Sequence, residues 1–166
     1  QHNHFIDFSQ LLPNELSFFT SLKADNKSNM PNIEKIVDLF LENGADPNLK
    51  DINDVYPLER AIVRSKEFSL ALLKSDKIDL SIKLKDIRKV NKNKPPMKTF
   101  LHLAAKEDSS IFSEILRKGV IDINSEDIDG NTPLMIACQY KNTEIVELLF
   151  KENNLDFLHC NKNGQD

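Results

Sequence analysis

Apolar residues recur at helical spacing in two short segments near the end of the chain. Thr132 and Pro133 open the first segment and suit the cap and first position of a helix, because the threonine hydroxyl accepts a backbone N–H and proline needs no acceptor there. Glu144 and Glu147 lie between the apolar positions of the second segment and give it a polar face. The expected inward positions are Leu134, Ala137 and Cys138 in the first helix and Ile145, Val146, Leu148 and Leu149 in the second.

The same pattern predicts four helix pairs along the chain. A single pair cannot bury its own apolar face, so about three or more pairs must stack to form a continuous core. An apolar lead-in at 5–12 precedes the first pair, where it either seals the open end of the stack or binds a partner. The predicted pairs are 13–24 with 31–43, 56–64 with 67–75, 99–106 with 109–118, and 132–140 with 142–152.

Short strings of residues repeat at intervals of 33 or 34. Asp127 precedes Asn161 by 34 residues, and Gly130 precedes Gly164 by the same interval. The segment 99–105 aligns with 132–138 at a shift of 33, and the segment 56–62 aligns with 99–105 at a shift of 43. The surplus of about ten residues indicates an insertion within 81–98. Asp127 to Gly130 is typical of a tight turn, in which Gly130 can take a positive φ.

These strings resemble the ankyrin repeat, whose hallmark sequences are T-P-L-H-x-A and G-A-D-x-N. Thr132 to Ala137 follows the first pattern and Gly44 to Asn48 the second, whereas Tyr56 replaces the threonine of the second copy. The resemblance implies an all-α ankyrin-repeat solenoid of about four helix-turn-helix repeats with projecting turns, and the opening of a fifth at the C-terminus. The expected boundaries are 1–12 for a capping segment, 13–50, 51–81, 94–126 and 127–160 for the repeats, 161–166 for the partial repeat, and 81–98 for the insertion.

The resemblance also implies a function, namely a non-catalytic module that binds another protein through its turn tips and first helices. Apolar or aromatic side chains at these positions suit binding hot spots, although scattered apolar side chains are also ordinary on protein surfaces. Carried over residue by residue, the implied contact residues are Ile52, Asn53, Val55, Val63, Arg64, Lys106, Glu107, Ile128, Asp129, Asn131, Gln139 and Tyr140.

Charge separates the insertion from the rest of the chain. The 166 residues carry a net charge of −4, of which the segment 81–98 contributes +6 and the remainder −10. A cationic segment on an acidic scaffold suits an acidic partner, a phosphate group or an anionic membrane, and a solvated loop is the alternative. The candidate contacts are Lys83, Lys85, Arg88 and Lys89. We expect no nucleic-acid partner, because the chain is acidic and the insertion has no aromatic residue to stack on bases.

Residues with catalytic or metal-binding chemistry are few. The resemblance gives His102 a structural role in bonding backbone near the turn, and we expect Cys138 to be an inert buried thiol. His159 lies beside Cys160, but no third group orients such a pair for nucleophilic catalysis. We therefore expect no catalytic residue, no metal site and no cofactor.

Location and wider context follow from composition. No apolar run is long enough to span a membrane, no signal peptide precedes the first pair, and two isolated cysteines suit a reducing compartment, so we expect a cytoplasmic monomer. Asn (17) and Lys (18) are frequent and Arg (4) is rare, as in AT-rich genomes, so the host cytosol is expected if the protein is a pathogen effector. Because the chain stops inside a fifth repeat, the alternative is a targeting arm of a larger enzyme or of a secreted effector, with the insertion contacting an acidic or phosphorylated ligand.

Overall fold

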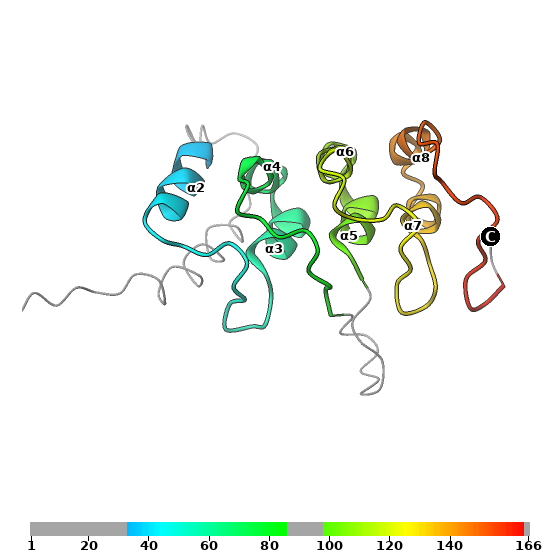
Figure 1. The fold of residues 1–166 in the computed structure, drawn as a ribbon, viewed down its shortest axis with the longest axis horizontal. Coiled ribbons are helices and arrows are strands. Elements are labelled where there is room, and N and C mark those ends of the chain that lie inside the picture. Colours follow the sequence, from blue (N-terminus) through cyan, green and yellow to red (C-terminus); the bar gives the residue numbers. More distant parts are fainter. Residues whose placement is uncertain (1–32, 86–97, 165–166) are drawn as a thin grey trace, which may run out of the picture. The chain divides into compact units, whose positions relative to one another are not determined.

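The computed structural model describes residues 33–85 and 98–164, and the regular elements in these ranges are all helices (Figure 1). The chain divides into two compact units, unit 1 over residues 1–78 and unit 2 over residues 79–166. None of the described helices is both long and apolar enough to cross a membrane. Unit 1 contains α2 (Ile33–Glu42), α3 (Pro57–Arg64) and α4 (Lys66–Lys74), and unit 2 contains α5 (Phe100–Glu107), α6 (Ser109–Arg117), α7 (Pro133–Gln139) and α8 (Thr143–Leu149).

In unit 1, α3 and α4 form a helix hairpin around Ser65 (Figure 1). The backbone N–H of Ser65 donates to the carbonyl of Ala61 at 2.8 Å and ends α3, while its hydroxyl accepts the backbone N–H of Phe68 at 3.4 Å and begins α4. A single extended residue therefore serves as the C-cap of one helix and the N-cap of the next. α4 also packs against α2. The buried apolar residues of these three helices are Val37, Leu41, Leu58, Ala61, Ile62, Phe68, Ala71, Leu72 and Leu73.

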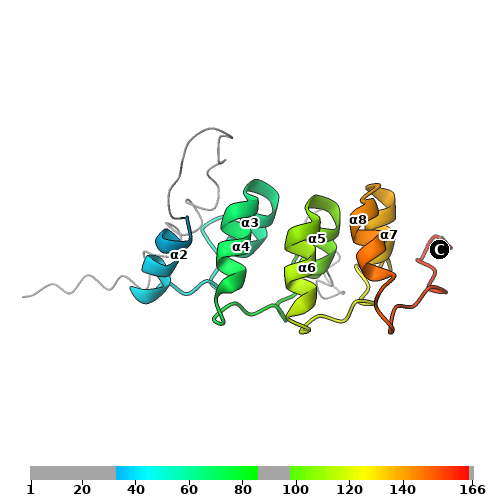
Figure 2. The ribbon, with the colours of Figure 1, turned by 90° about the horizontal axis from the view of Figure 1, so that it is seen from above.

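In unit 2, two hairpins pack side by side, α5 with α6 and α7 with α8 (Figure 2). α5 contacts α7, and α6 contacts α8, so the unit has an inner layer of α5 and α7 and an outer layer of α6 and α8. Each helix begins with a side chain that accepts a backbone N–H of its first turn, which satisfies a donor that the helix itself leaves unpaired. The four capping residues are Thr99, Asp108, Thr132 and Asn142.

Small side chains line the inner layer of unit 2, and large ones fill the space behind it. Ala104 of α5 and Ala137 of α7 are completely buried, and the absence of a longer side chain allows the two helices to approach closely. Phe112 and Ile115 of α6 and Ile145 of α8 are also completely buried. Burying a large apolar side chain contributes about 1.5–3 kcal/mol, so these residues hold the two layers together.

The predicted helices that fall on described residues are all present, with ends within about three residues of the expected ones. The predicted helix at 13–24 and the lead-in at 5–12 lie outside the described residues. The burial prediction for Cys138 was wrong: Cys138 is exposed, although Ala137 beside it is fully buried. This exposure indicates that the apolar stripe of α7 is wider than the surface that the neighbouring helices cover.

The same local motif follows α2, α4, α6 and α8. An aspartate carboxylate accepts the backbone N–H two residues further on, so the chain turns in the same way four times. The residue between donor and acceptor is apolar each time. The acceptor–donor pairs are Asp46 with Asn48 at 2.8 Å, and Asp79 with Ser81, Asp122 with Asn124, and Asp156 with Leu158 at 2.9 Å each. This repetition explains the regular spacing of the sequence strings.

Candidate functional site

The turn at 127–131 of unit 2 is organised by a buried aspartate. One carboxylate oxygen of Asp127 accepts the backbone N–H groups of Asp129 and Asn131, each at 2.9 Å, and both carboxylate oxygens accept from the Asn131 side-chain amide. The backbone N–H of Asp127 donates to the carbonyl of Asn131 at 2.9 Å, which closes the turn. Gly130 has φ 81°, as the sequence predicted, and this left-handed conformation favours glycine. The turn is therefore fixed before any ligand binds.

The segment 159–164 braces this turn from one side. Asn161 donates through its side-chain amide to the side-chain oxygen of Asn131 at 2.8 Å, and the backbone N–H of Lys162 donates to the carbonyl of Asp129 at 3.1 Å. His159 Nε2 lies 2.9 Å from the carbonyl oxygen of Gly130 and donates to it, and Lys162 Nζ donates to the carbonyl of Ile128. The two turns thus form one continuous rim within unit 2.

The C-terminal ends of α5 and α7 present polar and aromatic side chains to solvent. The Lys106 ammonium lies 5.3 Å from the ring centroid of Tyr140, within the range of a cation–π contact, and 3.4 Å from a carboxylate oxygen of Glu107. Tyr140 remains 46% exposed, and Gln139 is also exposed. Lys106 and Tyr140 therefore come from neighbouring inner helices and meet on one surface.

Unit 1 contains the equivalent turn at 51–55. Asp51 accepts the backbone N–H groups of Asn53 at 2.8 Å and Val55 at 3.1 Å, and its second carboxylate oxygen pairs with Arg60 of α3. The tip of the turn carries Ile52, which is 86% exposed. The carboxylate fixes the backbone, so the apolar tip side chain is held out in a defined position.

A lysine and a tyrosine also meet at this turn. Lys50 pairs with Asp54 at 2.7 Å and lies 4.9 Å from the ring centroid of Tyr56. The hydrogen bond to Asp54 is the main reason that the pKa of Lys50 is raised above its ordinary value. The described residues of each unit thus include a cation–aromatic pair.

His102 connects the inner layer of unit 2 to the turn at 127–131. Its Nδ1 accepts the backbone N–H of Thr99 at 3.2 Å, and its Nε2 donates to the carbonyl of Asn131 at 3.0 Å. The ring is buried, and burial lowers the pKa of His102 below the ordinary value of 6.5. The structural role expected for this histidine is confirmed.

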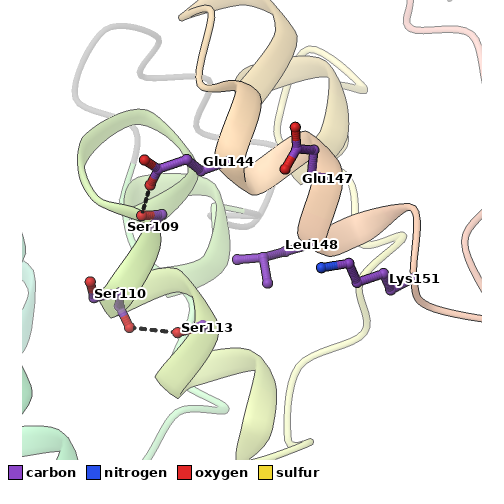
Figure 3. A pocket seen from close by; sticks show the side chains of 7 residues that line it. All are labelled: Ser109, Ser110, Ser113, Glu144, Glu147, Leu148 and Lys151. Atoms are coloured by element: carbon purple, nitrogen blue, oxygen red, sulfur yellow. Dashed lines mark hydrogen bonds between the residues drawn. The ribbon is translucent and has the colours of Figure 1, made fainter.

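A polar pocket of about 300 Å³ lies between α6 and α8 on the outer layer of unit 2 (Figure 3). Its lining residues are Ser109, Ser110, Ser113, Glu144, Glu147, Leu148 and Lys151. The Ser109 hydroxyl donates to Glu144, and that of Ser113 donates to the carbonyl of Ser110 at 2.9 Å. No histidine, cysteine or aspartate lines the pocket. In the described parts of the chain, no group of three or more His, Cys, Asp or Glu residues is placed to hold a metal ion.

Residues 70–164 match the family model for ankyrin repeats, in three copies. The match covers more than half of the chain. The chain belongs to the ankyrin repeat family. No curated protein matches the sequence. The all-α ankyrin fold expected from the sequence is confirmed, and ankyrin repeats are in general protein–protein interaction modules that are typically non-catalytic.

The contact residues predicted for the ankyrin surface divide between the two units. Unit 1 contains Ile52, Asn53, Val55, Val63 and Arg64, and unit 2 contains Lys106, Glu107, Ile128, Asp129, Asn131, Gln139 and Tyr140. Two of the predicted apolar anchors, Val55 and Ile128, are half-buried rather than exposed. At Ile128, the Lys162 side chain reaches across the turn and donates to the backbone carbonyl.

The basic insertion of this ankyrin protein is described only at its ends. Leu84 and Lys98 form an antiparallel bridge, with the backbone N–H of Leu84 donating to the carbonyl of Lys98 at 2.7 Å. Leu84 is completely buried, while Lys83 and Lys85 on either side of it are exposed. Arg88 and Lys89, the other two candidate contacts, lie outside the described residues.

Sequence reasoning missed the residues that join the two turns of unit 2. His159 was considered only as a partner of Cys160, and the cross-turn hydrogen bonds of Asn161 and Lys162 were not expected. The signal was present in the 34-residue interval from Asp127 to Asn161, because equivalent turns of adjacent repeats lie side by side. Similarly, the pairing of Asp51 with Arg60 fixes the turn of unit 1, and nine residues separate the partners.

Proposed function

We propose that the protein is a non-catalytic adaptor that binds a partner protein through its turn tips and inner helices. The observation that supports this proposal best is the rim of unit 2. Hydrogen bonds fix the turn at 127–131 against the segment 159–164, and the exposed Tyr140 lies on the same inner layer. A surface that is ordered before binding loses little conformational entropy on binding, so a modest contact area can give a stable complex.

Tyr140 is the side chain best suited to anchor the partner in unit 2. Tyrosine is enriched in binding hot spots because it offers a large, rigid contact area and a polar hydroxyl. The Lys106 ammonium lies 5.3 Å from the ring centroid of Tyr140, and the Glu107 carboxylate offsets part of the Lys106 charge. A partner with an apolar side chain for Tyr140 and a carboxylate for Lys106 would satisfy both groups.

Ile52 is the corresponding anchor in unit 1. Its side chain is 86% exposed to solvent. The Asp51 carboxylate fixes the backbone of the turn, so this apolar side chain stays at the turn tip. Val63, at the end of α3, is also exposed. Transferring such side chains from water into an interface contributes about 25 cal/mol for each Å² of apolar surface buried.

The test begins with capture of partners on the immobilised chain from a cell lysate and their identification by mass spectrometry. The identified partner is then titrated against the variants Tyr140→Ala and Ile52→Asp, and each variant is checked for its helix content. Because hot-spot residues contribute 2 kcal/mol or more, we expect the affinity to fall by about 30-fold or more in at least one variant.

Matched controls separate the proposed surface from general surface hydrophobicity. Phe150 is 58% exposed and Leu158 is 89% exposed, and neither belongs to the proposed contact residues. Phe150→Ala and Leu158→Asp should therefore bind with nearly unchanged affinity. Unchanged binding by both surface variants, together with loss in a control variant, would contradict the proposal.

We also propose that the adaptor works as a monomer in a reducing compartment. Cys138 and Cys160 are both exposed free thiols, a state that persists where cellular reductants keep cysteines from pairing. Analytical ultracentrifugation of the reduced protein tests the monomer, since a concentration-dependent rise in mass would contradict it.

A further inference from the structure

Two histidines bind consecutive carbonyl oxygens of the same turn. His102 Nε2 lies 3.0 Å from the carbonyl oxygen of Asn131, and His159 Nε2 lies 2.9 Å from that of Gly130. His102 belongs to α5, whereas His159 follows α8, so residues 57 positions apart in the sequence converge on the turn at 127–131. This turn forms part of the surface proposed above for partner binding.

The bond from His102 requires a neutral ring. A backbone N–H can only donate, so the contact from the N–H of Thr99 at 3.2 Å makes Nδ1 an acceptor and places the ring proton on Nε2. A second proton on Nδ1 would face the Thr99 N–H. The Thr99 hydroxyl, 2.8 Å from Nδ1, could accept that proton, but the buried Thr99 N–H would then lose its acceptor.

The charges facing His102 shift its pKa in opposite directions, and burial has a larger effect on that pKa than either charge. Asp127 of the turn favours the protonated ring, and Lys98 at the start of the α5 hairpin disfavours it. Burial, which leaves the residue 2% exposed, is the largest cause and lowers the pKa of His102. Burial in the closed turn therefore disfavours the protonated ring relative to an open, solvent-exposed turn.

The hydrogen bond from His159 to Gly130 does not require a neutral ring. Nε2 carries a proton both in the protonated ring and in the neutral tautomer that donates to Gly130, so it can donate to that carbonyl in either charge state. A carboxylate oxygen of Glu126 lies 3.8 Å from Nε2 and can pair with the charged form, while the nearby Lys162 ammonium donates to Ile128. The hydrogen bond to Gly130 therefore does not depend on the tautomer argument that applies to His102.

We propose that the turn at 127–131 is an acid-sensitive element, closed by neutral His102 and opened when His102 takes up a proton. Its consequence, weaker partner binding in mild acid, rests on the proposed function, because it requires the partner to contact this turn. The opening itself is a property of the protein alone and is measurable without any partner.

Proton linkage gives the direction and the size of the effect of pH on turn opening. The open turn exposes a histidine with an ordinary pKa of about 6.5, whereas the closed turn holds it neutral, so the open form binds more protons and gains as pH falls below about 6.5. If the closed form stays neutral throughout, the opening equilibrium constant rises about 30-fold from pH 7.5 to pH 5.0. Free carboxylates, with ordinary pKa values near 4, change little in this range.

Amide hydrogen exchange tests the opening. The backbone N–H groups of Asp127, Gly130 and Asn131 are all hydrogen-bonded within the turn, so their protection factors report its opening. We expect these factors, corrected for the intrinsic effect of pH, to fall between pH 7.5 and pH 5.0, by up to about 30-fold. The equivalent N–H groups of Asp54 and Val55 in unit 1 donate to Asp51, and the described residues of unit 1 include no histidine, so these groups should keep their protection.

Two variants identify the histidine responsible. His102→Gln keeps a side-chain donor but cannot titrate, so its protection factors should be independent of pH, whereas His159→Gln should retain the full dependence. Constant protection in the wild-type protein, or an equal fall in His102→Gln, would overturn the proposal. Imidazole nitrogen shifts of wild-type His102 give a check that needs no variant, because a proton on Nδ1 at pH 7.5 would equally overturn it.

Partner titration at both pH values then separates the two proposals. If the turn opens in acid and wild-type affinity falls while that of His102→Gln does not, both stand. If the turn opens and affinity is unchanged, the partner does not use this turn and the proposed contact at 127–131 fails, but the acid-sensitive turn remains.

Discussion

The replacement Asp127→Ala tests whether the turn at 127–131 is held by a single carboxylate. Asp127 is buried, and one of its oxygens accepts the backbone N–H groups of Asp129 and Asn131, each at 2.9 Å. Alanine removes the acceptor but leaves both donors inside the turn, where no other part of the turn can replace it. We therefore expect a large loss of stability from a change that removes no apolar contact.

The loss of stability in Asp127→Ala can be estimated from the two backbone N–H groups that lose their acceptor. A buried polar group left without its partner costs about 1–3 kcal/mol, and both N–H groups belong to half-buried residues that water reaches in part, so we expect the free energy of unfolding to fall by about 2–4 kcal/mol. For a chain of this size, each kcal/mol lowers the melting temperature by about 2–4 °C. The variant Asp127→Asn keeps an acceptor oxygen and should lose only about 1 kcal/mol.

The assay is urea unfolding followed by circular dichroism, with Asp122→Ala as the matched control. Asp122 accepts one backbone N–H, that of Asn124 at 2.9 Å, but its side chain is exposed and water can replace it. The control should therefore lose less than about 1 kcal/mol. If Asp127→Ala proves no more destabilising than Asp122→Ala, the reasoning that the buried carboxylate holds the turn is refuted.

Two further predictions concern packing and backbone conformation. Phe112→Ala should lower the free energy of unfolding by about 3–5 kcal/mol because the ring is completely buried, whereas Phe150→Ala should cost less than about 1 kcal/mol because that ring is largely exposed; similar losses in urea unfolding would contradict the packing of α6. Gly130→Ala and Gly164→Ala both place alanine at positive φ, at about 1–2 kcal/mol each, but only at Gly130 would the new Cβ lie 3.3 Å from the backbone nitrogen of Lys162. Gly130→Ala should therefore have the lower melting temperature, and equal values would show that the two turns are not in contact.

Local signals in the sequence were sufficient to place the helices. Thr132 and Pro133 were expected to begin a helix, and the Thr132 hydroxyl does accept the N–H of Met135 at 3.4 Å. These signals are reliable because capping involves residues only two or three positions apart. Where Tyr56 replaces the usual threonine, no side chain caps α3, yet the helix still begins at Pro57. Proline fixes the first φ angle, and the buried face of α3 supplies the remaining stabilisation.

Exposure was harder to predict because it depends on residues far away in the sequence. Cys138 was expected to be buried from its spacing alone, but spacing does not say how much of an apolar stripe the neighbouring helices cover. Ile128 was expected to be exposed, and it is half-buried in a turn whose Ile128 carbonyl accepts from Lys162, 34 residues later. The contact role of both turn tips remains a prediction from the family resemblance.

The turns separate the residues that determine the backbone from those that face a partner. At 51–55 and 127–131 an aspartate accepts the N–H groups two and four residues later, and at 161–164 Asn161 accepts the N–H of Asn163 in the same way. The residue directly after each acceptor, Ile52, Ile128 or Lys162, contributes no side chain to these bonds. Ile52 and Ile128 can therefore change without removing the bonds that fix their turns, whereas the Lys162 side chain also donates to the Ile128 carbonyl. A surface of this kind can acquire a different specificity while the fold stays the same. By contrast, His102 acts on the turn from within the core, so a proton there affects the whole turn rather than one contact.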